Sequence, residues 1–238
     1  MKIVVYTALF GDHDQLWSVP PDAARGATYV AFTEKPRKEV GRWTGAPGRE
    51  VILKGDGDLE PSVPTWKQRI VTPAFDSRKS ARYYKIMSHE ALPDADIVIW
   101  VDANIRLRAT PEVAAKWVLD YGLAAFKHLD RLCVYQEIAA CVNFGKGVKS
   151  DLLAQEKAYR AAGMPQKWGL ASTRCVVRRH TPEIIELNKA WWNEIQTYSV
   201  RDQVGLPFVC WKADLRWKEI PGTERSVNFW FIKHGDKP

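Results

Sequence analysis

The sequence lacks any apolar run long enough to cross a membrane. Its N-terminal apolar stretch covers only about eight residues, is interrupted by Thr7 and precedes acidic residues instead of a small-residue cleavage site. A membrane-spanning helix needs roughly eighteen apolar residues or more. We therefore expect a first β-strand at this position, a cytoplasmic protein and no stable membrane insertion.

The sequence also lacks paired cysteines. Its four cysteines form no Cys-x-x-Cys pair and have no nearby histidine pair at zinc-finger spacing; they are Cys133, Cys141, Cys175 and Cys210. Isolated cysteines of this kind usually lie reduced in a core. The pattern therefore argues against a structural zinc site and against a disulfide framework.

Acidic residues are too few to balance the basic ones. The 238 residues include 35 Lys and Arg against 28 Asp and Glu, which gives a formal charge of +7, and 46% of the residues are hydrophobic. This composition is typical of a globular protein and excludes a disordered, collagen-like or coiled-coil chain. The positive charge favours an anionic partner, which could be a nucleotide phosphate, an acidic polymer, nucleic acid or a membrane surface.

Short β-branched runs alternate with helical patterns, which predicts an α/β fold with a mostly parallel sheet between helices. No linker or repeat divides the chain, so we expect one domain, and the segment 41–64 is the longest irregular stretch. The expected strands cover 2–10, 28–33, 50–53, 96–101, 123–126, 175–178 and 226–232, and the expected helices cover 77–91, 111–120, 150–162 and 182–198.

Asp102 and Asn104 follow the most apolar of these strands. Ligands of open α/β sheets bind beyond the carboxyl ends of the strands. If the extended conformation continues for two residues, both side chains point the same way and offer hard oxygen ligands for Mg²⁺ or Mn²⁺ bound to a diphosphate. An Asp-x-Asn sequence is equally typical of an ordinary turn at a strand end.

The last residues of the chain offer a second set of ligands. Neutral imidazole from His234 suits a manganese site, while Lys233 or Lys237 could neutralise a phosphate. Taken alone, this segment is a basic tail in which a histidine is more often solvated than a ligand.

Several motifs, in this order, resemble one family. The chain reads YTALFGDHD near its start, then AFTE, RYYKIMSHE, IVIWVDANI and KHLDRLCVYQE, and later WW followed by SVRDQ. They resemble the glycosyltransferase-like hexosyltransferase family long catalogued as a domain of unknown function in plants and bacteria. The likeness spans about residues 4–211. The family usually has Asp-Gly-Asn where this chain has Ala103 in the middle, and His-Pro where Leu129 follows His128.

The resemblance implies a single GT-A (Rossmann-like) domain over residues 1–238, with a nucleotide-sugar-binding half at about 1–110 and an acceptor-side half at about 111–238. It implies a UDP-linked donor and an Mn²⁺ or Mg²⁺ ion. A distant likeness to glycogenin-like transferases favours retention of the anomeric configuration, whereas inversion would need a carboxylate base near the acceptor hydroxyl. It assigns the metal to Asp102, Asn104 and His234, and the donor to Thr7, Phe10, Arg82, Lys85, Asp102 and Lys237.

The resemblance also suggests residues for catalysis and for the acceptor. Asp202 and Gln203 look like the Asp-Gln pair beneath the transferred sugar, where a carboxylate stabilises an oxocarbenium-like centre. Asp202 could instead cap a helix. Glu137 is a further catalytic candidate, with His128 and Arg131 on the acceptor side; Glu137 is otherwise an ordinary helical surface residue.

Three other functions remain open. A nucleotidyltransferase usually has a glycine-rich phosphate loop after its first strand, and here only Gly11 follows. A carbohydrate or nucleic-acid binding module without catalysis would share the fold. The acceptor hydroxyl could belong to a glycan or to another hydroxyl compound. It could also belong to a hydroxymethylated DNA base, because basic residues gather at 78–82 and at 174–179.

Overall fold

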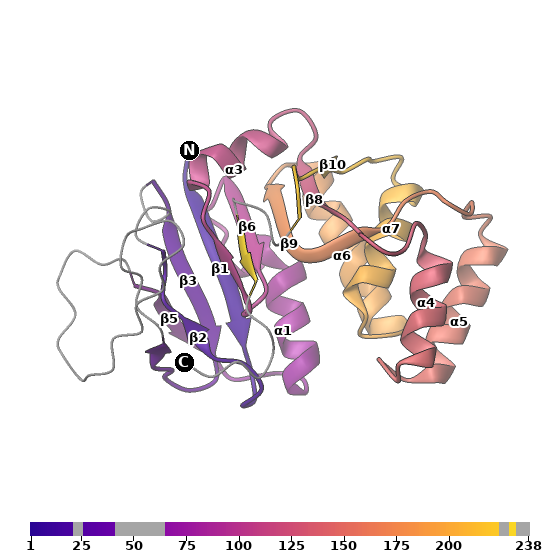
Figure 1. Ribbon diagram of the computed structural model, residues 1–238, viewed down its shortest axis with the longest axis horizontal. Helices are drawn as coiled ribbons and strands as arrows, with labels where there is room; N and C mark the ends of the chain where they lie inside the picture. Colours follow the sequence, from indigo (N-terminus) through magenta and orange to yellow (C-terminus); the bar gives the residue numbers. More distant parts are fainter. Residues whose placement is uncertain (21–25, 41–64, 224–228, 232–238) are drawn as a thin grey trace.

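The computed structural model describes residues 1–20, 26–40, 65–223 and 229–231. A seven-stranded sheet, in the order β10-β8-β9-β6-β1-β3-β5, runs through the described part (Figure 1). Its strands are β1 (Ile3–Leu9), β3 (Thr28–Thr33), β5 (Lys67–Ile70), β6 (Ile97–Val101), β8 (Leu123–Lys127), β9 (Ala171–Arg179) and β10 (Lys218–Glu219). All neighbours pair in parallel except β9, which is antiparallel to β6 and to β8. The expected mostly parallel α/β sheet is confirmed.

The central strands are apolar because helices or loops cover both of their faces. Every residue of β1 and of β6 is buried, and the two strands pair with Val5 opposite Ile99. Two short additional sheets flank the main one. They consist of β2 (Leu16–Trp17) with β4 (Glu39–Val40), and of β7 (Ile105–Leu107) with β11 (Phe229–Phe231).

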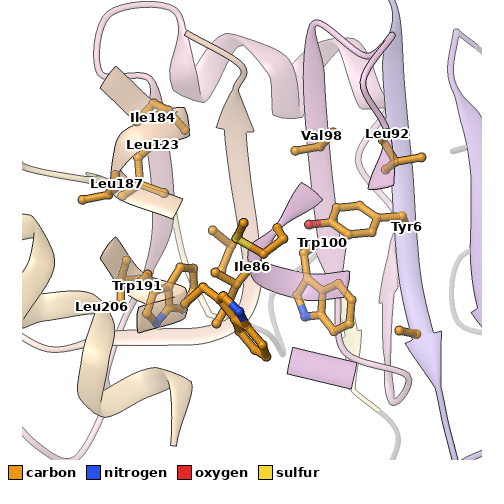
Figure 2. Packing of buried hydrophobic residues seen from close by; sticks show 14 of the residues in the cluster. Tyr6, Ile86, Leu92, Val98, Trp100, Leu123, Ile184, Leu187, Trp191 and Leu206 are labelled. Carbon is orange, nitrogen blue, oxygen red and sulfur yellow. The ribbon is translucent and has the colours of Figure 1, made fainter. Parts of the chain in front are cut away.

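One face of the sheet packs against three helices: α1 (Ser77–Ile86), α6 (Pro182–Thr197) and α7 (Asp202–Lys212). Figure 2 shows the core between them, where Trp191 of α6 lies with Leu206 of α7 and Ile86 of α1, while Trp100 of β6 lies beside Tyr6 of β1. Trp191 is fully buried. It is therefore a core residue.

The opposite face of the sheet is covered by α3 (Pro111–Ala115) and the short 3-10 helix η2 (Lys116–Val118). A third apolar cluster joins α7 to α4 (Val134–Asn143) and α5 (Lys149–Ala161). These last two helices lie at the end of the molecule away from β3 and β5 (Figure 1). Within the described ranges, no helix is both long and apolar enough to cross a membrane.

The single helix expected at 77–91 is wrong. The chain breaks at Met87 and continues as α2 (Ser88–Ala91). Arg178 explains the break, because its buried guanidinium donates to the carbonyl oxygens of Lys85 and Ile86, the latter at 2.8 Å, and so ends α1 at those residues.

The basic run at 174–179 is not entirely at the surface, because it includes Arg178. Its side chain is fully buried and donates to Asn188 Oδ1 at 2.6 Å and to the hydroxyl of Tyr6 at 2.5 Å. A cation at the carboxyl end of a helix is favourable because the last carbonyls carry partial negative charge. Arg178 is therefore an internal cap of α1 and no part of a nucleic-acid surface.

Other boundaries differ only by a few residues. The helix expected at 111–120 ends after one turn and continues as η2, whereas β9 is longer than the expected strand at 175–178. All four cysteines are buried and free, as expected. The expected strand at 50–53 and the irregular segment at 41–64 lie outside the described residues, as does most of the strand expected at 226–232.

Candidate functional site

Polar side chains gather at the edge of the sheet where β6 ends. Asp102 follows β6, Thr173 lies near the start of the antiparallel neighbour β9, and His128 follows β8. The backbone holds this edge together, because the Asp102 N–H donates to the Arg174 carbonyl at 2.8 Å and the His128 N–H to the Leu170 carbonyl at 2.9 Å. The described structure therefore brings residues from distant parts of the chain to one edge.

Asp102 and Asn104 lie in a turn between β6 and β7, so the extended conformation expected there is wrong. The Ile105 N–H donates to the Asp102 carbonyl at 2.8 Å and closes the turn. Asn104 is buried, whereas the Asp102 side chain is 28% exposed. Their side chains therefore do not project as neighbours along one strand face, and Asp102 is the more accessible oxygen ligand.

Asp102 is held by two donors on one oxygen. Its Oδ1 accepts from Trp100 Nε1 at 2.7 Å and lies 3.2 Å from Lys85 Nζ. Trp100 of β6 therefore positions the Asp102 carboxylate directly. Lys85 comes from α1, and its side chain is almost completely buried.

The same lysine reaches a second carboxylate. Lys85 Nζ lies 2.6 Å from Asp202 Oδ2, and Arg82 Nε lies 2.9 Å from Asp202 Oδ1. Arg82 and Lys85 project together because they are three residues apart on one helix. Thr173 Oγ1 also donates to Asp202 Oδ2 at 2.7 Å. We call these five residues, Arg82, Lys85, Asp102, Thr173 and Asp202, the Lys85 cluster.

The Asp202 carboxylate is buried yet ionised. Burial alone would raise its pKa, but Arg82 and Lys85 outweigh burial and hold the pKa well below its ordinary range. Asp202 is the first residue of α7, so the amino end of that helix favours the same charge. The helix-cap alternative is wrong in detail, because Arg201 occupies the N-cap position. Gln203 follows in the first turn and is half-buried.

His128, Arg131 and Glu137 come together, as expected. Arg131 Nε lies 2.5 Å from Glu137 Oε2, and His128 Nε2 lies 3.9 Å from the same oxygen. Glu137 is buried, so its interpretation as an ordinary surface residue is wrong. Arg201 joins the group from the N-cap of α7, with Nη2 3.7 Å from Glu137 Oε1. We call these four residues the Glu137 cluster.

The Glu137 cluster keeps its histidine neutral. His128 Nδ1 accepts from the backbone N–H groups of Asp130 and Arg131, both at 3.1 Å. Burial and the charge of Arg131 lower the pKa of His128. Burial works against the charge of Arg201, but Asp202 outweighs it and raises the Arg201 pKa. Arg201 is therefore a fixed cation next to Asp202 in the chain, and it connects the two clusters.

Thr7 lines a small cleft on the face of the sheet opposite α1. The cleft holds about 20 Å³, roughly the room of one water molecule. The Oγ1 of Thr7 is buried and has no hydrogen-bond partner among the described residues. The lining is largely aromatic and apolar and reaches the Asp102 turn; it includes Leu16, Trp17, Tyr29, Trp66, Asp102 and Arg106.

Phe10 does not line this cleft. It lies three positions after Thr7 in the chain, and side chains an odd number of positions apart point to opposite faces of an extended segment. The ring of Phe10 stacks on Tyr84 with 5.6 Å between ring centroids. Phe10 belongs to the core that faces α1.

His234, Lys233 and Lys237 lie outside the described residues. The last described strand, β11, is antiparallel to β7, with Phe231 opposite Ile105. Ile105 is three residues from Asp102 in the chain, and His234 is three residues from Phe231.

The motifs missed two side chains that complete the site: Thr173 and Arg201. Arg201 precedes the Asp-Gln pair directly, so its position alone was a usable signal. Thr173 carries no signal of its own, because its contact with Asp202 depends on how α7 packs against β9. Likewise, nothing in the sequence indicated that Trp17 and Trp66 line the cleft beside Thr7.

Comparisons with known proteins agree with this architecture. The family model described as TOD1/MUCI70, glycosyltransferase-like domain, matches residues 1–223. Probable hexosyltransferase MUCI70 of Arabidopsis thaliana is 24% identical over 175 residues, which cover 67% of this chain and 30% of that protein.

A solved structure, the WbbM bifunctional glycosyltransferase in its apo form, matches 93% of this chain and 38% of its own length. The TM-score is 0.50 at 12% sequence identity, which shows a shared fold alone. The chain thus spans about a third of the length of either relative. Because the family model covers nearly all of the sequence, the chain belongs to the TOD1/MUCI70 glycosyltransferase-like domain family.

Proposed function

We propose that the protein is a glycosyltransferase that moves a hexose from a UDP-linked sugar donor to an acceptor hydroxyl. The observation that carries the proposal is the Lys85 bridge. One buried ammonium holds Asp102, at the end of the central strand, and Asp202, at the start of α7, in a single site. Family membership supports sugar transfer, and the bridge supplies the two carboxylates that such a transfer uses.

In this proposal the donor lies across the Asp102 edge of the sheet. The uracil and ribose occupy the cleft lined by Thr7 and Trp17, which has to widen from its present volume, and the diphosphate lies beside Asp102. The unpartnered Oγ1 of Thr7 is available for a polar group of the nucleoside. The sugar then extends toward Asp202 and the Glu137 cluster.

A divalent ion fits the charge of the site. The two carboxylates and the two cations of the Lys85 cluster balance one another. An incoming diphosphate therefore brings negative charge that this cluster does not offset. Mn²⁺ or Mg²⁺ would supply that charge and stabilise the leaving diphosphate.

The ligands of that ion would come from Asp102, with Asn104 and His234 as further candidates. The described residues hold no group of three His, Cys, Asp or Glu side chains that could bind an ion by themselves. The exposed part of the Asp102 carboxylate suits a hard cation. The remaining ligands would then include His234 and the donor's own phosphates.

The chain's own residues then act on the sugar. Asp202 stays ionised and stabilises positive charge as the bond between the anomeric carbon and the diphosphate breaks. The Gln203 side chain accepts a hydrogen bond from a sugar hydroxyl or donates one to it. The acceptor oxygen forms the new bond to the anomeric carbon, and its proton leaves to the released diphosphate. Lys85 and Thr173 are positioning residues, because they fix Asp202 without reaching the sugar.

The Glu137 cluster lies on the acceptor side in this scheme. Arg131 and Arg201 hold Glu137, and neutral His128 can exchange hydrogen bonds with a hydroxyl compound. A glycan acceptor is the version that we propose. For a DNA acceptor the available basic surface is smaller than the sequence suggests, because Arg178 is buried.

The test is a panel of UDP- and GDP-linked sugars, read by release of the nucleotide. We expect release with one UDP-hexose in the presence of Mn²⁺, and its loss on addition of a chelator. Unchanged release in chelator would contradict the metal assignment. Thermal stabilisation by UDP with Mn²⁺, without release from any donor, would favour a binding module.

A further inference from the structure

The turn between α4 and α5 exposes two large apolar side chains at the end of the molecule away from β5. Phe144 is 70% exposed and Val148 is 60% exposed. Leu153, one turn into α5, is 46% exposed. We call residues 144–148 the Phe144 turn. Figure 1 shows α4 and α5 at the rim of the fold, opposite the β3 and β5 side.

The backbone of the Phe144 turn is well defined. The Lys146 N–H donates to the Cys141 carbonyl at 2.8 Å, and the Gly145 N–H to the Val142 carbonyl at 3.3 Å. Gly145 and Gly147 have φ values of 62° and 113°, which side-chain-bearing residues rarely adopt. The carboxyl end of α4 is thus closed by hydrogen bonds, and the Phe144 side chain is exposed instead of folding back onto the core.

The charged residues at the Phe144 turn itself are lysines. Lys146 and Lys149 flank the apolar side chains, and the nearest acidic residues in the sequence are Glu137 and Asp151. Lys146 Nζ lies 5.6 Å from the centroid of the Phe144 ring. Along α5, Lys149, Leu153 and Lys157 follow one another at helical spacing on the exposed side.

We propose that the Phe144 turn docks the protein onto an anionic lipid bilayer. Phe144 and Val148 enter the boundary between headgroups and acyl chains, and Lys146, Lys149 and Lys157 lie against the anionic headgroups. Apolar side chains with flanking lysines bind membrane surfaces in this way, without a spanning helix.

A lipid surface fits better than a protein partner because the apolar side chains project from a convex turn. A protein interface normally has a broader apolar core with a polar rim. The lysine flank is complementary to a surface of many negative headgroups. The proposal does not depend on the proposed transferase activity, because none of these residues belongs to the Lys85 or Glu137 cluster.

The test is co-sedimentation of the purified chain with vesicles of phosphatidylcholine alone or mixed with phosphatidylserine. We expect binding only to the mixed vesicles, weaker at high salt. Lys146→Gln with Lys149→Gln should weaken binding about thirtyfold, at about 1 kcal/mol for each lysine. Phe144→Ser with Val148→Ser should weaken it at least tenfold. All four residues are exposed, so thermal unfolding should not change.

Matched controls are exposed residues elsewhere. Leu119→Ser removes an exposed apolar side chain outside the turn, and Lys127→Gln with Lys212→Gln removes two exposed lysines. These variants should bind like the parent chain. Absence of binding to mixed vesicles, equal binding to neutral vesicles, or equal losses in the controls would overturn the proposal.

A second measurement reports the turn itself. The four native cysteines are buried, so Phe144→Cys introduces one accessible thiol for an environment-sensitive dye. We expect a blue shift of its emission with mixed vesicles and none with neutral ones. Self-association of the chain that Phe144→Ser abolishes, without a lipid-induced shift, would mean that the turn is a protein interface and would contradict the proposal.

Discussion

Asp102 and Asp202 share one cation, although they lie at the end of a central strand and at the start of the last long helix. Lys85 Nζ is 3.2 Å from Asp102 Oδ1 and 2.6 Å from Asp202 Oδ2. Through these two contacts Lys85 brings the Asp102 and Asp202 carboxylates into one site. Lys85 is therefore the residue whose loss should disturb the site most.

Replacing Lys85 should destabilise the fold. Lys85→Met leaves two carboxylates without their shared partner, and Asp202 is buried. Breaking a buried ion pair by removing one member costs roughly 3–5 kcal/mol. Urea denaturation should show a loss within that range. Lys127→Met, at an exposed lysine, is the control and should be neutral; equal effects of the two changes would contradict the bridge.

Replacing Arg178 should destabilise the fold, whereas replacing its neighbour in β9, Arg179, should leave the stability almost unchanged. Arg178→Met leaves the carbonyls at the end of α1 without their buried donor and should cost about 3 kcal/mol. Arg179 is exposed, so Arg179→Met should stay within about 0.5 kcal/mol. Thermal unfolding of both variants checks this. A neutral Arg178→Met would mean that Arg178 does not cap α1.

Mild acid should destabilise the protein through His180. Burial and the charge of Arg178 lower the pKa of this histidine from 6.5 to about 4. The unfolded state therefore binds the proton first, and the stabilisation present above about pH 6.5 is lost as the pH falls toward 4.

The loss should amount to about 1–3 kcal/mol, since His180 is partly exposed. His180→Gln should flatten this part of the pH profile of the unfolding free energy. The same slope in the variant would assign the acid sensitivity to other groups.

Glu137→Gln should lower turnover with the acceptor and, because Glu137 is buried, should also lower the stability of the fold. The change keeps the side-chain shape but removes the charge that holds Arg131 and Arg201. We expect at least a tenfold loss in kcat/KM for the acceptor, with a smaller change in donor binding. Gln136→Ala, on the exposed side of α4, is the control. An equal loss of donor affinity would move the cluster from the acceptor to the donor.

Much of the central fold was predictable because its signals are local. The apolar run of β6 predicts a buried strand, and Asp102 at its end follows directly. Asp202 was expected from a resemblance to an Asp-Gln pair, and the structure brings its carboxylate to Lys85, which also contacts Asp102.

Side-chain contacts between distant segments were not predictable. Lys85 was expected beside the donor's phosphates or sugar, since nothing in the neighbouring sequence shows that α7 brings a carboxylate to it. An arginine such as Arg178 usually lies on the surface. Here the break at Met87 leaves the carbonyl oxygens of Lys85 and Ile86 buried, and Arg178 donates to both.

The most direct measurement is nucleotide release by Asp202→Asn with the cognate donor and Mn²⁺. Asp94→Asn, at the exposed partner of Lys2, is its matched control. We predict that Asp202→Asn lowers kcat by about a hundredfold or more while UDP with Mn²⁺ still raises its melting temperature, and that the control keeps full turnover. Full turnover in Asp202→Asn would contradict the assignment of this carboxylate to sugar transfer.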